Sequence, residues 1–596
     1  MRGRFAYFAL GVVAQCVVVL ALSLALPTKA RAVTYDDWYR LAAGQAVSPA
    51  AAAAGDLSQS WTAPDGRTIK AVVRQPANPA GPTVVLNAVP AGADARPYFD
   101  DLVARAVAAK ASKLVIPPGT YRFRTLGNNA HWFIRRLNDA TIVGTGATLL
   151  FDADEAGITV SECQRLKLVG LTLDYNFRTT SWGHMLPAPD KIHGVIQIDD
   201  PASVTAADGL GHIAQYDKAT GKPDPADLRV YTTGAQWQGD GRYFSMGFGK
   251  NTIGKQFVVF HHYYGGTALK LLGDPMSGAK QTEDITIDRV RIVRSPGMGI
   301  VVSGVKRGVA ITNSKIVPAA GEPISTEYDA IHILPFGGDL IVQGNTLVGA
   351  GDDNINLNSP VMTVAAVSGA TVTLGHWSYF IRPGHVLMAL DGDYRIIGSA
   401  TVTGVPPQMD PTGNNAIALD RPIPGLSAAH FVWDAGLSMS RVAILNNSFT
   451  TGGKVLVQVA NVLIQGNTFD GSGVRLTSNL GTFVEGEGAL NVAVQANRFT
   501  GGKITNRYGF PFAAISAYAV TASDKLAAAP VHRWIAINKN TIAGVPQAAI
   551  SIGSAANVRV AGNTASGTFL LTSRGADFNI LTNADLRAFG NVATLP

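Results

Sequence analysis

The sequence predicts an all-β fold, a right-handed parallel β-helix, in a chain of 596 residues. Three observations carry this prediction. One hexapeptide pattern, apolar-x-x-Asn-x-apolar, recurs at steps close to one coil of such a helix. Short runs of Val, Ile and Thr alternate with turn residues, as in a protein of many short strands. Finally, 47% of residues are hydrophobic and only 15% are charged, with 64 glycines, so a long chain can bury a continuous core between tight turns.

The first element is an N-terminal export signal. Two arginines precede an apolar run over residues 5–26, and an Ala-x-Ala cleavage sequence ends at Ala32. An uncleaved membrane anchor is the alternative, because the run of about 20 residues is long enough to span a bilayer. We predict a signal peptide over 1–32, an N-terminal extension over 33–90, and a periplasmic or secreted protein with no membrane span after signal removal.

Charge and cysteine content exclude several functions. The formal net charge is +7, but the signal segment holds four of these cations and no acid, so the remaining chain carries 7 − 4 = +3. Cys163 is the single cysteine of the mature chain, which therefore forms no internal disulfide. The sequence shows no concentrated basic patch, no Gly-rich phosphate loop with a lysine and no Cys/His zinc spacing. These absences argue against nucleic-acid, nucleotide and zinc roles.

The β-helix is predicted over 91–596. A helix is expected over 96–110 from its apolar spacing, followed by a strand within 113–123 and early coils over 140–151. This opening resembles that of pectin-lyase-like β-helices. There, a helix covers the first coil and hides the open edge of the sheets.

The repeated hexapeptide marks later coils. Its central asparagine suits a turn, because asparagine tolerates left-handed backbone angles and its amide can bond to the same amide one coil away. The pattern occurs at 342–347, 444–449, 464–469, 494–499, 537–542 and 560–565. A β-sandwich also contains short strands but rarely repeats one hexapeptide at such steps.

Two stretches interrupt this rhythm. Residues 195–275 and 361–437 contain alternating strands mixed with Gly, Asp and Pro turns. We predict a small inserted β module at each place. We expect the modules to border the binding face; the alternative for the first module is that it has no part in binding.

Three aspartates form the candidate catalytic site. Asp353 follows Asp329 by 353 − 329 = 24 residues, about one coil, which places the two about 5 Å apart across neighbouring strands. Asp352 adds a third carboxylate, and mutual repulsion tends to raise one pKa and leave another group ionised, as acid/base hydrolysis requires. His332 and Asn356 share the same offset and are expected to line the site and bind the substrate.

The backbone around the aspartates needs a bend. Side chains alternate along a strand, so Asp352 and Asp353 cannot both project outward from a straight one. We expect Gly351 to let the chain turn both carboxylates toward solvent. Asp and Asn are also common at β-helix turns, where they only satisfy backbone amides.

Other chemistries fit the same acids. Clustered carboxylates are good ligands for calcium, which would suit a polysaccharide lyase. A lyase also needs a basic residue to remove a ring proton, and no Lys or Arg lies inside either Asp strand. A non-catalytic carbohydrate-binding β-helix is the third reading, because the fold alone supplies a long adhesive face.

Three further residues are candidates for sugar binding. Glu485 on a loop could bind sugar hydroxyls, or be a solvated acidic turn. Trp182 with His184 could form an aromatic sugar platform, or the Trp could pack in the core.

One family resemblance combines these residues. The block 348–357, preceded by Asp329 to His332, resembles the active-site coils of glycoside hydrolase family 110, the α-1,3-galactosidases, and the stretch 464–499 with Glu485 resembles its later coils. The resemblance implies an inverting hydrolase of glycans without metal or cofactor. Asp329 would be the general acid, while Asp352 and Asp353 would activate water. Inversion needs about 6.5–9.5 Å between acid and base carboxyls.

The resemblance is incomplete. Where the galactosidases carry a basic stretch, this chain has 450–457, in which only Lys454 could stand in as a substrate-binding cation. Polygalacturonases also pair an Asp on one coil with Asp-Asp on the next, but their downstream Gly-His-Gly and Arg-Ile-Lys signatures are absent here. A polygalacturonase-like enzyme and a lyase therefore stay as alternatives to an α-galactosidase-like hydrolase.

Overall fold

The computed structural model describes residues 34–44, 52–77, 80–223, 229–231, 234–273, 281–410, 413–451, 453–501, 506–507, 510–511, 513–545, 548–565, 568–572 and 592–595. The predicted signal peptide lies outside these residues. Among the described residues, no helix is both long and apolar enough to cross a membrane.

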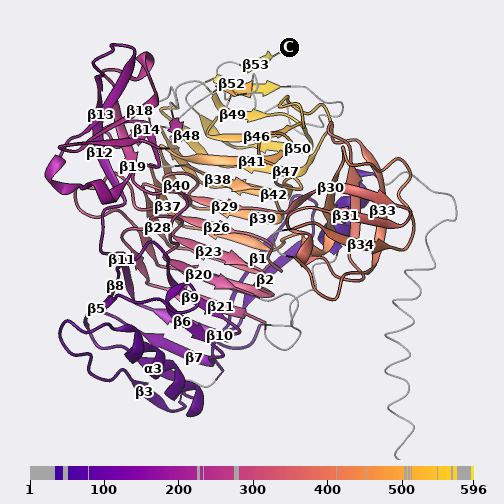
Figure 1. The fold of residues 1–596 in the computed structure, drawn as a ribbon. Helices are drawn as coiled ribbons and strands as arrows, with labels where there is room; N and C mark the ends of the chain where they lie inside the picture. Colours follow the sequence, from indigo (N-terminus) through magenta and orange to yellow (C-terminus); the bar gives the residue numbers. More distant parts are fainter. Residues whose placement is uncertain are drawn as a thin grey trace, which may run out of the picture.

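The fold is a right-handed parallel β-helix (Figure 1), as the sequence predicts. Three long parallel sheets run along it, and most coils contribute one strand to each. The first sheet consists, in spatial order, of β3 (Thr83–Val85), β4 (Lys113–Val115), β7 (Asn138–Val143), β10 (Gln164–Val169), β21 (Glu283–Asp288), β24 (Arg307–Thr312), β27 (Leu340–Gln343), β36 (Val442–Leu445), β39 (Ala460–Gln465), β42 (Leu490–Gln495), β47 (His532–Asn538) and β50 (Ala555–Ala561).

The second and third sheets follow the same order along the axis. The second consists of β5 (Gly119–Phe123), β8 (Ala147–Phe151), β11 (Thr172–Tyr175), β22 (Arg291–Ile292), β25 (Lys315–Ile316), β28 (Thr346–Val348), β37 (Ser448–Thr450), β40 (Thr468–Asp470), β43 (Arg498–Thr500), β48 (Thr541–Ala543) and β51 (Thr564–Ala565). The third consists of β6 (Ala130–Arg135), β9 (Ala156–Ser161), β20 (Leu269–Leu272), β23 (Ile300–Ser303), β26 (Ile331–Ile333), β29 (Ile355–Leu357), β38 (Lys454–Val457), β41 (Gly473–Asn479), β46 (Ile515–Val520), β49 (Ala548–Ile552), β52 (Thr568–Thr572) and β53 (Val592–Leu595).

Apolar side chains fill the interior in columns. The phenylalanines that end three of the hexapeptides, Phe449, Phe469 and Phe499, stack at centroid distances of 4.8 and 4.5 Å. Each is fully buried, so one hexapeptide position becomes one continuous apolar row along the axis.

A ladder of asparagine amides marks the turn between the first and second sheets. Each side-chain amide donates to a backbone carbonyl, and every amide except that of the last member, Asn563, also donates to the side-chain oxygen of the asparagine one coil further on, at 2.9–3.0 Å. The ladder consists of Asn345, Asn447, Asn467, Asn497, Asn540 and Asn563, all buried. These are the central asparagines of the hexapeptides, so the predicted amide-to-amide bonding is confirmed.

A helix covers the first coil. This helix, α3 (Arg96–Ala108), places Phe99 edge-to-face against Phe123 at 4.9 Å and Trp132 at 5.0 Å. It ends two residues before the predicted boundary, because Lys110 adopts a left-handed φ of 48°.

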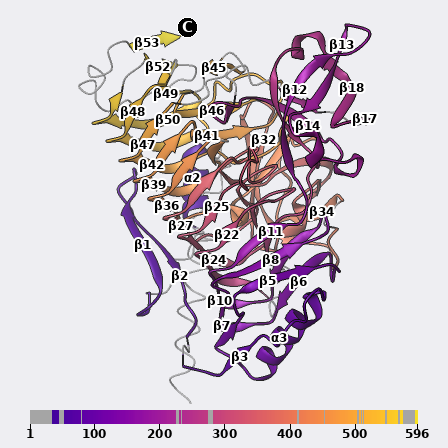
Figure 2. The same ribbon diagram turned by 90° about the vertical axis from the view of Figure 1, so that its left-hand side faces the viewer.

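An antiparallel sheet is inserted between β11 and β20 (Figure 2). Its strands span residues 180–260, so it begins before the predicted start at 195, and β20 within the predicted range belongs to the β-helix. Its strands are β12 (Thr180–Pro187), β13 (His193–Ile198), β14 (His212–Asp217), β15 (Lys222–Pro223), β16 (Arg229–Tyr231), β17 (Gln236–Gly239), β18 (Arg242–Gly249) and β19 (Gln256–Phe260), with 3-10 turns at Pro201–Ser203, Ala206–Asp208 and Lys250–Thr252.

A closed six-stranded barrel is inserted between β29 and β36. It consists of β30 (Val361–Ser368), β31 (Thr371–Leu374), β32 (Val386–Leu390), β33 (Ile396–Gly404), β34 (Asn415–Leu419) and β35 (Phe431–Asp434), with 3-10 turns at Ser378–Phe380 and Ala435–Leu437. In the chain, the inserted sheet directly precedes β20 and the barrel directly follows β29, and both of these strands belong to the third sheet. The two insertions therefore lie at opposite ends of the third-sheet strands (Figure 1).

Residues 34–44 and 52–77 of the predicted N-terminal extension pack on the outside of the β-helix, whereas β3, also within the predicted range, is the first strand of the first sheet. The helix α2 (Tyr35–Gly44) contacts the barrel, with Trp38 5.8 Å from Trp433. The hairpin β1 (Leu57–Thr62) and β2 (Thr68–Val73) covers apolar residues on the outer face of the first sheet. A short hairpin of β44 (Asn506–Arg507) and β45 (Phe510–Pro511) completes the described elements.

Candidate active site

The three aspartates lie just before two neighbouring strands of the third sheet. In the ladder between β26 and β29, His332 pairs with Asn356, which is the register that the 24-residue offset predicts. Ile331 and Ile333 point into the core on either side of His332, so His332 and Asn356 face outward. The site therefore occupies the outer face of this sheet.

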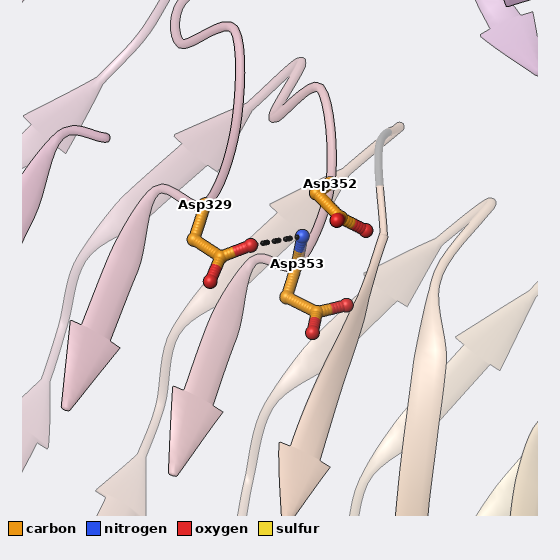
Figure 3. Close-up of side chains that lie close together, drawn as sticks. All are labelled: Asp329, Asp352 and Asp353. Atoms are coloured by element: carbon orange, nitrogen blue, oxygen red, sulfur yellow. Dashed lines mark hydrogen bonds between the residues drawn. The ribbon is translucent and has the colours of Figure 1, made fainter. Parts of the chain in front are cut away.

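The carboxyl groups form a compact trio (Figure 3). One oxygen from each of Asp329, Asp352 and Asp353 lies within 4.8 Å of the others. The backbone N–H of Asp353 donates to Asp329 Oδ1 at 2.8 Å, which ties the two coils together at this point. We refer to these residues as the carboxyl trio.

The trio members differ in exposure. The Asp352 side chain is 43% exposed, whereas those of Asp329 and Asp353 are 5% and 4% exposed. The expectation that both adjacent carboxylates face solvent is thus wrong for Asp353. Gly351 is needed for a different reason: a Cβ there would lie 2.2 Å from the carbonyl oxygen of Glu327, so its role is a close backbone approach.

Two basic side chains contact the trio. Lys454 begins β38, one coil beyond Asp353, and its Nζ lies 2.5 Å from Asp353 Oδ1 and 3.8 Å from Asp352 Oδ1. His332 Nδ1 lies 2.5 Å from Asp329 Oδ2. The sequence assigned both residues to substrate binding, but the structure places each against a carboxylate of the trio.

Burial dominates the electrostatics of the trio. Burial raises the pKa of Asp353 well above its usual range, and the charges of Asp352 and Asp329 raise it further, although Lys454 opposes them. Burial alone would lower the pKa of Lys454, but the carboxylates of Asp353 and Asp352 outweigh it, so the pKa is raised and Lys454 stays an ammonium. The trio is therefore a coupled group in which the buried carboxyl of Asp353 resists ionisation.

His332 follows the same logic. Burial would lower its pKa, but the hydrogen bond and charge of Asp329 reverse the shift and raise it.

The trio oxygens are close enough to ligate a hard cation such as calcium. Lys454 already supplies a positive charge between two of these carboxylates, which disfavours a second cation there.

A second polar group lies at the other end of the same strands. Glu485 accepts a hydrogen bond from the amide of Asn358 at 2.8 Å, and its backbone bridges to Pro360 and Asn479. Its pKa is raised, chiefly by burial. Glu485 thus belongs to an ordered loop beside β29 and is not a freely solvated turn.

The structure brings Trp182 and His184 to the inserted sheet. Trp182 is half-buried and packs with a cluster that includes Phe260 and Ile324, the core role that the sequence left open. His184 Nδ1 lies 2.8 Å from Asp199 Oδ1. Both residues lie on β12.

Sequence reasoning missed the tyrosines next to the trio. Tyr264 stacks on Tyr328 at a centroid distance of 3.9 Å, and Tyr328 directly precedes Asp329. Burial raises the pKa of Tyr264 to about 12, and the charge of Asp352 contributes to this shift. The adjacent pair Tyr263-Tyr264 before two glycines is the signal that could have indicated an exposed aromatic loop.

Comparison with known proteins gives structural similarity only. No protein-family model matches the sequence, and no curated protein matches it. The resemblance to glycoside hydrolase family 110 therefore stays a prediction.

Three solved structures illustrate the similarity. The exopolygalacturonase of Thermotoga maritima has a TM-score of 0.42 and 11% identity, with 84% of this chain and 89% of that chain covered. The A-module of the Azotobacter vinelandii mannuronan C-5 epimerase AlgE4 has a TM-score of 0.40 and 12% identity, with 86% and 98% covered. The Streptococcus pneumoniae surface adhesin PfbA has a TM-score of 0.39 and 13% identity, with 82% and 87% covered. A hydrolase, an epimerase and an adhesin assign no single activity to this chain.

Proposed function

We propose that this protein is an exported glycoside hydrolase that cleaves α-galactosidic or related linkages in glycans or polysaccharides. The observation that supports this proposal is the carboxyl trio, which combines a buried carboxyl of raised pKa with a carboxyl that reaches solvent. Hydrolysis of a glycosidic bond requires one acid and one base or nucleophile of this kind, held on a rigid frame.

The environments of the three carboxyls suggest their roles. Asp353 retains a proton and gives it to the leaving oxygen as the glycosidic C–O bond breaks. Asp352 accepts a proton from the water that attacks the anomeric carbon. Asp329 has both oxygens engaged, one by the Asp353 N–H and one by His332, so it positions the acid. This division differs from the one that the resemblance implies, in which Asp329 is the acid.

The separation of the acid and base carboxyls bears on the stereochemical outcome. The resemblance implies inversion, for which acid and base carboxyls are about 6.5–9.5 Å apart. Trio oxygens within 4.8 Å of one another are closer to the separation of about 5–5.5 Å in retaining enzymes. Proton NMR of the first product released distinguishes the two, because inversion and retention give opposite anomers.

A neutral sugar suits the site better than a uronate. Lys454 is engaged by two carboxylates, so its charge is already neutralised before a substrate arrives. A galacturonate would add another negative charge to a group that already contains the three aspartates and Glu485. This disfavours the polygalacturonase-like alternative.

A polysaccharide lyase is the second candidate, because Lys454 supplies a basic residue that is absent from the two Asp strands. Its raised pKa keeps it protonated, so it is a poor acceptor for a sugar ring proton. A lyase would generate the ultraviolet absorbance of an unsaturated sugar, whereas a hydrolase generates none. Loss of activity on chelation would point to the calcium-dependent form.

The direct test is a hydrolysis screen. Purified protein would be incubated with nitrophenyl glycosides, α-1,3-linked galacto-oligosaccharides and bacterial exopolysaccharides, and reducing ends would be measured. We expect hydrolysis of at least one galactose-containing substrate and a loss of about 100-fold or more in Asp352→Asn. Asp101→Asn, which removes an exposed carboxylate from the cap helix α3, is the matched control.

Two outcomes contradict the proposal. Full activity of Asp352→Asn and Asp353→Asn on an authentic substrate would remove the trio from the chemistry. Glycan binding that survives replacement of all three aspartates, with no product from any bound glycan, would favour the non-catalytic binding role.

A further inference from the structure

Exposed aromatic side chains gather around the candidate site. Among the described residues, the large aromatic side chains classed as exposed are Tyr231, Tyr263, Tyr264 and Phe483. The three tyrosines belong to the inserted sheet and the loop that follows it, and Phe483 lies two residues before Glu485. Aromatic rings left in water at one place on a surface are typical of a binding site, since their faces pack on apolar ligand surfaces.

A row of stacked rings joins these tyrosines to the trio. Tyr264 stacks on Tyr328, the neighbour of Asp329, and Tyr263 lies 5.1 Å from Tyr264. His212 lies 5.8 Å from Tyr328 and stacks on Tyr231 at 5.0 Å. We refer to Tyr231, Tyr263 and Tyr264 as the tyrosine shelf. The shelf thus begins beside Tyr328, next to the carboxyl trio, and continues onto the inserted sheet.

A pocket adjoins the far end of the shelf. Its volume is about 280 Å³, close to the lower end of the range of about 300–1,000 Å³ for small-molecule sites. Its lining consists of Tyr231, Gly234, Gln236, Phe244, Ser245, Met246 and Gly247. This lining combines ring and thioether surfaces with an amide and a hydroxyl, and it contains no charged side chain. A sugar residue has the matching chemistry, an apolar C–H face with a rim of hydroxyls.

The shelf is held in place from both sides. His262, the residue before Tyr263, bonds through Nδ1 to the buried carboxyl of Glu327 at 2.8 Å, and Glu327 precedes Tyr328. On β15, Lys222 Nζ lies 2.8 Å from Asp470 Oδ1 on the β-helix. These links fix the inserted sheet relative to the trio, so binding would not require ordering of a loose module.

We propose that the tyrosine shelf and its pocket are outer subsites for an uncharged oligosaccharide that extends from the carboxyl trio across the inserted sheet. This inference rests on the proposed function and makes it more specific. The substrate is then a neutral glycan of several residues, and recognition extends well beyond the sugar at the cleaved bond.

The test measures how affinity depends on chain length. The full-length Asp353→Asn protein, in which we expect turnover to be about 10³-fold slower, would be titrated with α-1,3-linked galactobiose and galactotetraose and with di- and tetragalacturonate. We expect the neutral tetrasaccharide to bind about 10-fold or more tightly than the disaccharide. In the same background, Tyr231→Ala and Gln236→Ala should each reduce that ratio about 10-fold. Ile192→Ala, which removes a 64% exposed apolar side chain of the inserted sheet outside the pocket, should leave it unchanged.

Several results would overturn the inference. These are equal affinity for the neutral disaccharide and tetrasaccharide, tighter binding of the galacturonates, absence of binding to all four probes, or an unchanged ratio of tetrasaccharide to disaccharide affinity (the length ratio) in both Tyr231→Ala and Gln236→Ala.

The proposed function fails on different results. If the wild-type protein cleaves no bound glycan while the length ratio still depends on Tyr231, the subsites stand and the hydrolase proposal falls. If it cleaves glycans without that dependence, only the subsites fall.

Discussion

Two polar columns run through the same coils of this β-helix, and they have opposite energetic characters. The asparagine ladder consists of neutral side chains in which each amide donates to the next and every member is buried. The carboxyl trio packs three acids of like charge within 4.8 Å, with one lysine against two of them. In the ladder, every buried polar side chain has hydrogen-bond partners, which is the condition for stable stacking of polar groups. In the trio, like charges are packed together, and such local conflicts are typical of functional sites.

Asp353→Asn gives the largest expected effect and tests the role of the carboxyl trio in catalysis. The amide keeps the shape but cannot release a proton, so kcat should fall by about 10³-fold, within the range for loss of a general acid. The free energy of unfolding should change little, since the amide has the size and shape of the protonated carboxyl. Activity assays and denaturant unfolding of the same preparation check both parts. A large loss of stability with retained activity would show that Asp353 has a structural role, like the asparagines of the ladder.

Asn467→Asp converts one rung of the ladder into an acid. The variant loses the amide donors to Ile444 and Asn497, and at neutral pH it buries an unpaired charge. We expect a loss of about 3 kcal/mol in the free energy of unfolding at pH 7 and a smaller loss at pH 4, where the acid can hold a proton. Gln465→Ala, at an exposed position of the same hexapeptide, is the control. Equal stability of Asn467→Asp and wild type at pH 7 would contradict the structural role of the ladder.

Glu487 is a buried acid outside the trio, so it separates the effect of burial from that of function. Burial raises its pKa to about 8, against hydrogen bonds from Ser438 and Ser359. Because the folded pKa lies above the unfolded value, this group's contribution to stability is complete at acid pH and is lost as pH rises through about 8. Glu487→Gln should therefore be more stable than wild type at pH 9, by about 2 kcal/mol, with the difference shrinking toward pH 5. A difference that does not depend on pH would refute this.

Lys454→Met gives the smallest expected effect and tests the coupling within the trio. Lys454 lowers the pKa of Asp353, so its removal should move the alkaline limb of the kcat profile upward by about one pH unit or more. The loss in kcat at the optimum should be about 10-fold, because the acid retains its proton but the site loses a positioning contact. An alkaline limb that moves downward would show that Lys454 acts in another way.

The fold was predictable because its signals are local and repeated. The asparagine of each hexapeptide both makes the turn and bonds to the next coil, so Asn467 and Asn497 could be assigned to one column from spacing alone. The 24-residue offset also gave the pairing of His332 with Asn356, because both lie in regular strands. The inserted sheet was located less well, since β12 has the alternation of an ordinary coil strand.

The trio was predictable in membership but not in environment. Spacing cannot show that Lys454, 454 − 353 = 101 residues after Asp353, returns to its side, because the whole barrel lies between them. Nor does it show that Asp353 is buried, with its side chain 4% exposed, while its neighbour Asp352 reaches solvent. The tyrosine shelf was missed for a similar reason: the contacts of Tyr264 with Tyr328 and of Tyr231 with His212 form only through an insertion whose position has no periodic signal.

The barrel insertion also sets an order of events during folding. Asp329, Asp352 and Asp353 are synthesised before the barrel, and Lys454 after it. Until β38 docks on β29, the three acids lack this partner, and closing the chain across the barrel carries an entropic cost. Coils of a solenoid gain stability only from neighbours already in place. We therefore expect the coil that bears the trio to be the late, rate-limiting step of assembly.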